Sequence, residues 1–164
     1  LLPLIKCPLV IDADALNAIS THKNWLDILN PETVLTPHPK EMSRLMGLAT
    51  QKIQKNRIAT ASQFAADHSL TLVLKGSPSL IAMADGTVII NPTGNAGMAT
   101  GGSGDVLTGI IAGLMAQGLP QASIAGSYIH GQAGDYFAKN ESETTLIAGD
   151  LLRSLPETLK RILP

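Results

Sequence analysis

Residues 91–109 read NPTGNAGMATGGSGDVLTG and mark the point at which the chain changes its character. Short apolar runs separated by polar loops precede this stretch, whereas the rest of the chain reads as helices. Eight of the 15 glycines lie between Gly94 and Gly118. Glycines allow a backbone to turn its N–H groups inward, and a helix N-terminus adds about half a positive charge. The run 101–104, which ends where an apolar helix begins, therefore predicts a binding site for an anion, most often a phosphate.

The spacing of these glycines excludes two common phosphate-binding loops. The Walker sequence GxxxxGK[ST] does not occur in the chain. The dinucleotide fingerprint GxGxxG fails because Leu107 stands where a third glycine would follow Gly102 and Gly104. What remains is a glycine-rich turn at the N-terminus of a helix.

Asp105 directly follows this turn and has two interpretations. It can cap the helix by accepting hydrogen bonds from the helix's own N–H groups. A bound phosphate would repel the carboxylate, however, which makes a purely capping role awkward. Alternatively, Asp105 is a base that takes the proton of a hydroxyl group while backbone donors hold the transferring phosphoryl group.

Apolar runs in the first half of the chain predict an α/β fold with a mostly parallel sheet. Runs without polar alternation indicate strands that are buried on both faces. Asp85 and Gly86, which stand between two such runs, are a strong hairpin signal. The predicted strands cover Leu9–Ile11, Val34–Thr36, Thr71–Lys75, Leu80–Ala84 and Thr87–Ile90.

Helices are predicted between and after these strands. The best-defined one begins at Pro39 and ends at Met46, because proline at the first helical position and glycine just past the end are the expected asymmetry. In such sheets ligands bind outside the carboxyl ends of the strands. The loops in those positions are 12–17, 36–41, 75–79 and 91–104. The other predicted helices cover Ala15–Ser20, Gln51–His68, Asp105–Gln117, Gln121–Lys139 and Ile147–Leu155, with a last turn at Glu157–Ile162.

Five glycines interrupt the predicted helices, and each costs up to about 1 kcal/mol relative to alanine. We expect them to permit close helix packing or, at the first of them, close approach of a ligand. His130 lies among them and is expected to be a packing histidine with satisfied hydrogen bonds. The five are Gly109, Gly113, Gly126, Gly131 and Gly134.

Composition limits the class of protein. The 164 residues, 45% of them hydrophobic, suit a single domain over 1–164 with a buried aliphatic core. A net charge of -1 and the lack of a basic run make nucleic acid and anionic membranes poor partners. No apolar run could span a membrane and no signal peptide is evident, so we expect a cytoplasmic protein. No Cys/His cluster suggests zinc, and Cys7 is expected to be a small buried side chain.

The first predicted strand indicates that the chain is the later portion of a longer polypeptide. Residues 9–11 are apolar without alternation, as in a central strand that is covered on both faces and paired on both edges. Such a strand rarely opens a domain, and the later chain offers too few strands to flank it. We therefore expect preceding βαβ units and, in their absence, an open sheet edge at this strand.

Four motifs resemble, in the same order, those of the ADP/ATP-dependent NAD(P)H-hydrate dehydratases. This family belongs to the ribokinase-like superfamily, and many members were once labelled carbohydrate kinases. The resemblance covers about residues 9–155 and implies a ribokinase-like three-layer α/β fold that lacks its N-terminal βαβ units here. The motifs are Asp12-Ala13-Asp14-Ala15-Leu16-Asn17, Thr36-Pro37-His38-Pro39-Lys40-Glu41, Asn91-Pro92-Thr93-Gly94-Asn95-Ala96-Gly97-Met98-Ala99 and Gly101-Gly102-Ser103-Gly104-Asp105.

The resemblance implies a metabolite-repair reaction. Hydrated NADH or NADPH carries an added hydroxyl group on its nicotinamide ring. The family phosphorylates that hydroxyl from ADP in the bacterial type or ATP in the eukaryotic type, and elimination of phosphate restores the reduced cofactor. Mg²⁺ is expected with the nucleotide. A homo-oligomer, and a fused or separate NAD(P)H-hydrate epimerase, are expected as partners.

Motif matching also implies residue roles. Asp105 is the base and contacts the hydrate, and the anion hole consists of Gly102, Ser103 and Gly104. The nucleotide-binding residues are Lys75, Gly76, Ser77, Pro78 and Ser79, together with Asn95, Ala96, Gly97, Met98, Ala99, Thr100, Gly101 and Gly104. The hydrate-binding residues are His38, Pro39, Lys40 and Glu41, with the stretch up to Arg44, and Asp14 and Asn17.

Lys75 and the residues after it have a plain structural alternative. Lys75 ends a predicted strand, where its ammonium group can be a solvated charge. Ser77 and Ser79 fit a turn around Pro78.

The proposed hydrate-binding residues have alternatives of the same kind. Glu41 lies in the first turn of a helix, where a carboxylate is favourable without any function. Asp14 and Asn17 are equally compatible with helix capping. In related kinases an Asn-x-x-Glu sequence helps to organise magnesium, but His38 holds the Asn position here, which argues against direct metal ligation by this segment.

Two other functions remain open. A kinase of the same superfamily that acts on a sugar or a vitamin alcohol would share the anion hole and the base. If the preceding units are missing, the chain would be a fragment that binds nucleotide but does not catalyse the reaction. A nucleotide-dependent assay on this chain and on the whole gene product distinguishes the three.

Overall fold

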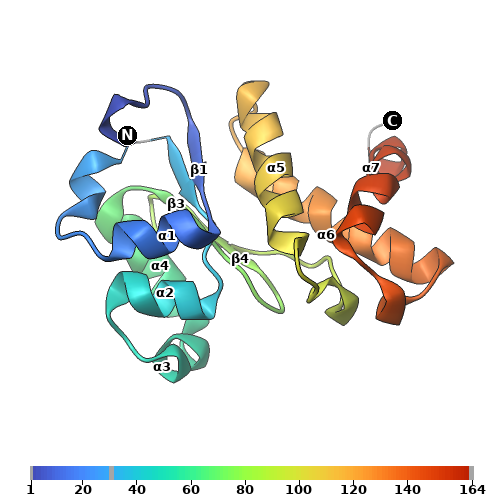
Figure 1. The fold of residues 1–164 in the computed structure, drawn as a ribbon, viewed down its shortest axis with the longest axis horizontal. Coiled ribbons are helices and arrows are strands. Elements are labelled where there is room, and N and C mark those ends of the chain that lie inside the picture. The colour runs from blue at the N-terminus through green and yellow to red at the C-terminus, as the bar shows by residue number, and fades with distance from the viewer. Residues whose placement is uncertain (1, 30–31, 163–164) are drawn as a thin grey trace. The chain divides into compact units, whose positions relative to one another are not determined.

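A computed structural model describes residues 2–29 and 32–162 (Figure 1). The chain divides into two compact units, Leu1–Ile90 and Asn91–Pro164. The five strands belong to the first unit, and the described residues of the second unit form helices and loops. The expectation of a single domain over residues 1–164 stays a prediction.

The first unit contains a five-stranded sheet whose strands follow one another in chain order. The first three strands pair in parallel, with Val10 opposite Val34 and Leu35 opposite Leu72. The last three pair antiparallel, so the sheet is mixed, with two parallel and two antiparallel pairings, where the sequence predicts a mostly parallel one. Gly86, at a φ of +84°, forms the turn of the predicted hairpin, which is confirmed. The strands are β1 (Leu9–Ile11), β2 (Thr33–Leu35), β3 (Thr71–Leu74), β4 (Leu80–Ala82) and β5 (Val88–Ile90).

β1 forms one edge of this sheet, because β2 is its only partner in the part of the chain that the structure describes. Leu9 and Val10 are half-buried there, and Ile11 is buried. The sequence predicts such an open edge for a chain without preceding βαβ units. That such units precede it in a longer polypeptide stays a prediction.

One apolar core joins the helices of the first unit to the sheet. Leu72, Leu74 and Leu80 point to this core from β3 and β4, whereas Val73 and Ile81 point to the opposite face and are also buried. Burial on both faces explains why these strands are apolar without alternation. The helices are α1 (Ala13–Ser20), α2 (Pro39–Met46), α3 (Thr50–Lys55) and α4 (Arg57–His68), with 3₁₀ turns at Leu2–Leu4 and Trp25–Ile28.

The predicted bounds of α2 are confirmed, and Gly47 ends it in the left-handed conformation. The single helix predicted over 51–68 is wrong. The chain breaks at Asn56, whose φ of -132° and ψ of 42° are not helical, between α3 and α4. The break changes the direction of the chain so that Ile53 from α3 and Phe64 from α4 reach the same core.

The second unit is helical. Its last helix, α7, runs through Pro156, so the separate last turn predicted after residue 155 is wrong. Pro156 is exposed, and the carbonyl it leaves without a donor belongs to Leu152, which is also exposed, so water can satisfy it. The elements are η3 (Ala96–Met98), α5 (Ser103–Ala116), α6 (Ala122–Asn140), η4 (Glu143–Thr145) and α7 (Ala148–Ile162).

Three of the five helical glycines permit close packing, as predicted. A Cβ on Gly126 would lie 2.7 Å from Cγ1 of Ile111, between α6 and α5. A Cβ on Gly131 would collide with Thr93, and one on Gly134 would collide with Met98. At the other two, 109 and 113, a Cβ would meet no described atom within 4 Å, so packing does not explain them.

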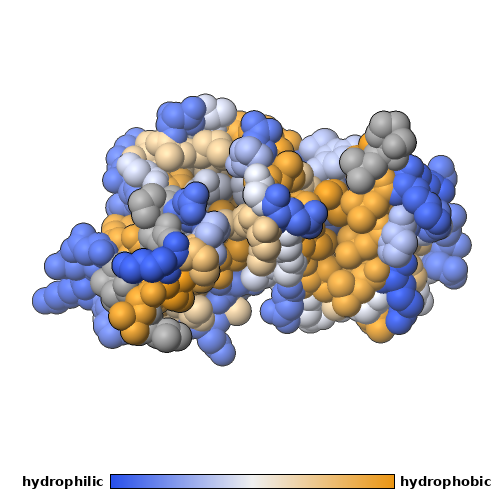
Figure 2. Space-filling view, turned by 90° about the horizontal axis from the view of Figure 1, so that it is seen from above, coloured by the Kyte–Doolittle hydropathy of each residue, from blue (hydrophilic) through white to orange (hydrophobic). Residues whose placement is uncertain are grey.

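The surface mixes charged and apolar residues, which Figure 2 shows in blue and orange for the face seen from above. Cys7 is exposed, so its predicted burial is wrong: it precedes β1 instead of lying within the core. Within residues 2–29 and 32–162, no helix is both long and apolar enough to cross a membrane. The cytoplasmic location stays a prediction. Exposed large apolar side chains are Leu4, Ile58, Ile90, Leu119, Tyr128, Ile147 and Leu152.

Candidate active site

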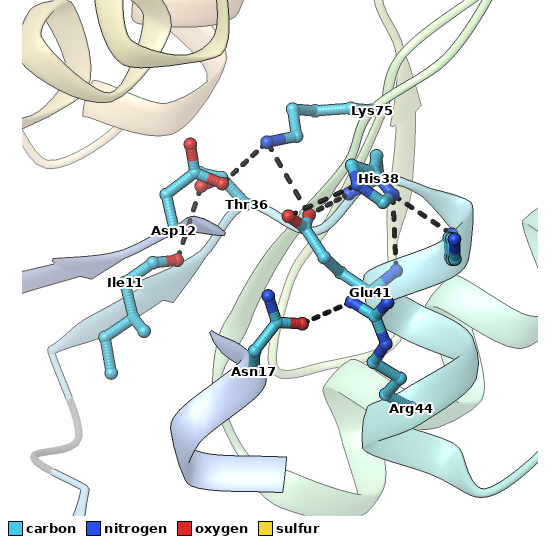
Figure 3. Close-up of polar contacts among 9 residues, drawn as sticks. Ile11, Asp12, Asn17, Thr36, His38, Glu41, Arg44 and Lys75 are labelled. Carbon is cyan, nitrogen blue, oxygen red and sulfur yellow. Dashed lines mark hydrogen bonds and ion pairs between the residues drawn. The ribbon is translucent and has the colours of Figure 1, made fainter. Parts of the chain in front are cut away.

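Lys75 lies in a polar cluster at the carboxyl ends of β1, β2 and β3 (Figure 3). Its Nζ is 2.6 Å from Oδ1 of Asp12 and 3.8 Å from Oε2 of Glu41. Asp12 directly follows β1 and Lys75 directly follows β3, and parallel pairing brings these ends to one edge of the sheet. The side chains of all three are between 6% and 19% exposed. The alternative of a solvated Lys75 is therefore wrong.

His38 and Glu41 form a reciprocal cap at the start of α2. Nδ1 of His38 accepts from the N–H groups of Lys40 and Glu41 at 3.1 and 3.2 Å, and Oε2 of Glu41 accepts from the N–H of His38 at 2.7 Å. Because Nδ1 accepts, the proton of a neutral ring lies on Nε2, 3.3 Å from Oε1 of Glu41. Both residues therefore have structural roles here, and their contact with the hydrate stays a prediction.

Asn17 and Arg44 link α1 to α2 below this cluster (Figure 3). Nη1 of Arg44 donates to Oδ1 of Asn17 at 2.5 Å. Asp12, not Asp14 or Asn17, holds the N-cap position of α1, so the capping alternative for those two residues is wrong. Asp14 is exposed in the first turn, and Ala13 between the two aspartates adopts a left-handed φ of +49° that alanine rarely takes.

Arg57, the first residue of α4, holds the loop after β3. Its Nη2 donates to the carbonyl oxygen of Pro78 at 2.6 Å and to that of Leu74 at 3.3 Å. Gly76 has a φ of +154°, and a Cβ there would lie 2.5 Å from the same guanidinium, so a larger residue would require Arg57 to shift from this position. Burial lowers the pKa of Arg57 from its usual value, but a guanidinium stays charged. The turn alternative is confirmed for Ser79, whose Oγ donates to the carbonyl of Gly76 at 3.1 Å.

In the second unit, the glycine-rich run forms the N-terminal turn of α5. Gly102 is the N-cap residue, in the left-handed conformation with a φ of +85°, and Ser103 begins the helix and is buried. Asp105 lies in the first turn and is exposed. Its carboxylate makes no hydrogen bond or ion pair with any residue that the structure describes. The capping alternative is therefore wrong, and this carboxylate is available to a ligand.

The segment before this turn is fixed by acidic side chains. The carboxylate of Asp135 on α6 accepts from the N–H of Gly94 at 2.9 Å and from Nδ2 of Asn95 at 3.0 Å. Glu143 in η4 accepts from the N–H of Gly97 at 3.2 Å. Residues 99, 101 and 102 are exposed beyond these anchored positions. These acidic side chains thus hold residues 94–97, and the backbone beyond them is partly bonded within the loop, since the N–H of Ala99 donates to the carbonyl of Ala96 and that of Ser103 to the carbonyl of Thr100.

The loops of the candidate site are predictable from the sequence, whereas several of the residues that hold them are not. Residues 38–41 and 75–79 lie in the first unit, and residues 95–105 lie in the second. Asp12 had a usable signal, since it stands directly after the apolar run of β1. Arg57, Asp135 and Glu143 contact partners 17 to 46 residues away and have no local signal.

The described residues contain no group of three or more His, Cys, Asp or Glu side chains that could hold a metal ion. Asp12 and Glu41, the two carboxylates beside Lys75, already share its charge. Mg²⁺ in such a site would be bound mainly through the phosphate oxygens of a nucleotide, as is usual for this ion.

Polar side chains at the carboxyl ends of parallel strands, and a glycine-rich helix N-terminus with a free carboxylate, are typical of α/β proteins that bind phosphate-bearing ligands. The chain belongs to the NAD(P)H-hydrate dehydratase family, whose sequence profile matches residues 4–157.

Comparison with known proteins agrees with that membership. The chain is 51% identical over 164 residues to the bifunctional NAD(P)H-hydrate repair enzyme of Moorella thermoacetica, covering 99% of this chain and 31% of the relative. The ADP/ATP-dependent NAD(P)H-hydrate dehydratase from Bacillus subtilis, co-crystallized with ATP/Mg²⁺, matches with a TM-score of 0.83 at 37% identity, over 94% of this chain and 55% of that one.

A ribokinase-like superfamily protein from Enterococcus faecalis matches with a TM-score of 0.76 at 33% identity, over 93% of this chain and 52% of that one. The expected family and the ribokinase-like α/β fold are thus confirmed. The chain spans between 31% and 55% of the length of these three proteins.

Proposed function

We propose that the protein carrying this chain restores NADH and NADPH from their hydrates, with ADP or ATP as the phosphoryl donor. The free carboxylate of Asp105, in the first turn of α5 directly after the glycines, is the observation that carries this proposal. A base is needed beside the site where a phosphoryl group meets a hydroxyl group, and a helix N-terminus supplies the donors for the phosphoryl oxygens. Membership of the dehydratase family supports the choice of substrate.

The proposed reaction has two steps, a phosphoryl transfer and an elimination of phosphate. Asp105 takes the proton of the ring hydroxyl, and the hydroxyl oxygen bonds to the terminal phosphorus of the nucleotide. The bond from that phosphorus to the rest of the nucleotide breaks in the same step. AMP leaves when ADP is the donor, and ADP leaves when ATP is the donor. The carbon–oxygen bond to the phosphate then breaks and its electron pair leaves on inorganic phosphate. The neighbouring ring carbon gives its proton to water, and the electron pair of that carbon–hydrogen bond restores the ring double bond.

The remaining residues bind and orient the two substrates in this proposal. Backbone N–H groups of residues 102–104 hold the oxygens of the transferring phosphoryl group, and Mg²⁺ would neutralise the charge of the phosphates. The nucleotide-binding set consists of residues 75–79 and 95–101. The hydrate-binding set consists of residues 38–41, Asp14 and Asn17.

The test is a nucleotide-dependent assay on the full-length protein with NADH hydrate and NADPH hydrate. Recovery of the absorbance of the reduced cofactor, with phosphate release that requires ADP or ATP, is the expected result. Phosphorylation of a sugar or a vitamin alcohol without recovery of reduced cofactor would replace the proposal with a small-molecule kinase. The same assay on residues 1–164 alone shows whether this chain catalyses the dehydration without the rest of the protein.

We also propose an NAD(P)H-hydrate epimerase as a partner, fused or separate, since the relative from M. thermoacetica is named as bifunctional. A homo-oligomer remains part of the proposal. Epimer interconversion by the full-length protein, and its mass in solution, test these two points.

A further inference from the structure

His130 lies in α6, is 8% exposed, and contacts the first residue of α5. Its Nε2 is 3.0 Å from the carbonyl oxygen of Ser103 and 3.4 Å from Oγ of the same residue. A carbonyl oxygen can only accept a hydrogen bond. The proton of the neutral ring therefore lies on Nε2, and His130 donates to the backbone of Ser103.

This hydrogen bond fixes a peptide group at the start of α5. The carbonyl of Ser103 and the N–H of Gly104 belong to one planar, trans peptide unit and point in opposite directions. The first turn of α5 orients this peptide, and the bond from His130 holds its oxygen against α6 as well, so it limits movement of the Gly104 N–H. The first N–H groups of a helix have no partner within the helix, so this N–H is one of those that an anion can use.

The same helix anchors the preceding segment. Asp135, five residues after His130 on α6, accepts from Gly94 and Asn95. Gly131 lets α6 approach that segment closely, because a Cβ there would collide with Thr93. α6 thus fixes both the segment before the turn and the turn itself, and His130 is its contact with the turn.

We propose that His130 is a positioning residue of the anion hole. Its Nε2–H holds the Ser103–Gly104 peptide so that the Gly104 N–H points at the transferring phosphoryl group. The proposal deepens the function proposed above and rests on it.

The test compares two substitutions in the full-length protein. His130→Gln keeps an N–H donor, and His130→Met is unbranched and similar in length but has none. We expect Met to lower kcat about 10–100-fold, less than the roughly 100–1,000-fold cost of removing an anion-hole donor outright, with the nucleotide KM changed less than about twofold. We expect Gln to return kcat to within about threefold of the unsubstituted protein.

Thr158→Val is the matched control, because it removes another buried hydrogen bond of the second unit, 2.8 Å from Oγ1 to the carbonyl of Ser154 in α7. Its melting temperature should fall as that of the Met variant does, while kcat stays unchanged. A Met variant with unchanged kcat, or equal losses in the Met and Gln variants, overturns the proposal. If the unsubstituted protein shows no dehydration at all, the proposed function fails instead.

A second measurement needs neither activity nor a substitution. The ¹⁵N spectrum of the His130 ring should show the proton on Nε2 at neutral pH, and inorganic phosphate should shift the Gly104 amide resonance. A proton on Nδ1, or a Gly104 resonance that phosphate leaves unchanged, overturns the proposal.

Discussion

The cluster around Lys75 and the turn before Asp105 both carry charged side chains, but in opposite states. Lys75 is paired with Asp12 at 2.6 Å and lies 3.8 Å from Glu41, which also closes the cap of α2. Asp105 makes no such contact with the described residues and is exposed. In the first region the charges connect the ends of β1 and β3 to α2, whereas in the second a carboxylate is kept available.

This difference separates residues that support a site from residues that act in it. Partly buried and paired charges are costly to disturb, so their substitution should be felt first as lost stability. A free carboxylate contributes little to stability, so its substitution should lower kcat and leave the free energy of unfolding nearly unchanged.

The largest expected effect is on turnover. Asp105→Asn should lower kcat at least about a hundredfold, the usual weight of a general base, while nucleotide binding and the melting temperature stay nearly unchanged. Steady-state kinetics and nucleotide titration on the full-length protein measure this. Asp67→Asn, another exposed acid on a helix, is the control and should leave kcat unchanged. Turnover near that of the unsubstituted protein would reduce Asp105 to a surface charge.

The second prediction concerns the packing that supports the free carboxylate. Gly131→Ala should lower the free energy of unfolding by about 3 kcal/mol, because the new Cβ would collide with the side chain and backbone of Thr93. Urea unfolding measures it. A loss below about 0.5 kcal/mol would mean that α6 moves away easily and that the segment before the turn is not rigidly held.

The third prediction concerns the paired region. Asp12→Asn should lower the free energy of unfolding by about 1.5–3 kcal/mol, because the amide oxygen can still accept from Nζ of Lys75 but the charge that pairs with this partly buried ammonium is lost. Glu157→Gln is the matched control, since Glu157 and Lys160 are also 2.6 Å apart but are 50% and 70% exposed. No measurable change is expected in the control. Equal effects in both variants would show that burial does not distinguish the Lys75 cluster.

The smallest expected effect is on the free energy of unfolding and contrasts Gly109 with Gly131, both in the second unit. Gly109→Ala should raise the free energy of unfolding by about 0.5–1 kcal/mol, because alanine favours a helix and the site has room for its Cβ. Turnover of the same variant tests the ligand alternative for Gly109. A stabilised protein with a raised KM would place a substrate against this part of α5, whereas an unchanged KM would exclude that.

Local signals in the sequence predicted most of the elements. Helix α2 was predicted at both ends because proline and glycine leave little choice of backbone there. The break at Asn56 was not predicted, because neither glycine nor proline marks it. The break serves to bring Ile53 and Phe64 into one core, which is a tertiary effect. Pro156 misled the prediction of α7, because an exposed proline costs a helix less than a buried one.

The sequence predicted which loops form the candidate site but not which side chains contact one another there. The strand ends and the glycine-rich turn indicated where ligands bind, since these positions follow from the α/β architecture. The pairing of Lys75 with Asp12, 63 residues apart, and the contact between His130 and Ser103 depend on the folded chain. A single sequence carries no local signal for such pairs.

The contact between Asp12 and Lys75 has a consequence for how the sheet opens. β1 is three residues long, its only neighbour among the described residues is β2, and short edge strands are the segments that open most readily. The ion pair connects the end of β1 to the end of β3, two strands away. β1 therefore cannot separate without breaking a contact of β3. The amide hydrogens of β1 should accordingly exchange with solvent in the same opening event as those at the end of β3, rather than in an independent fraying of the edge.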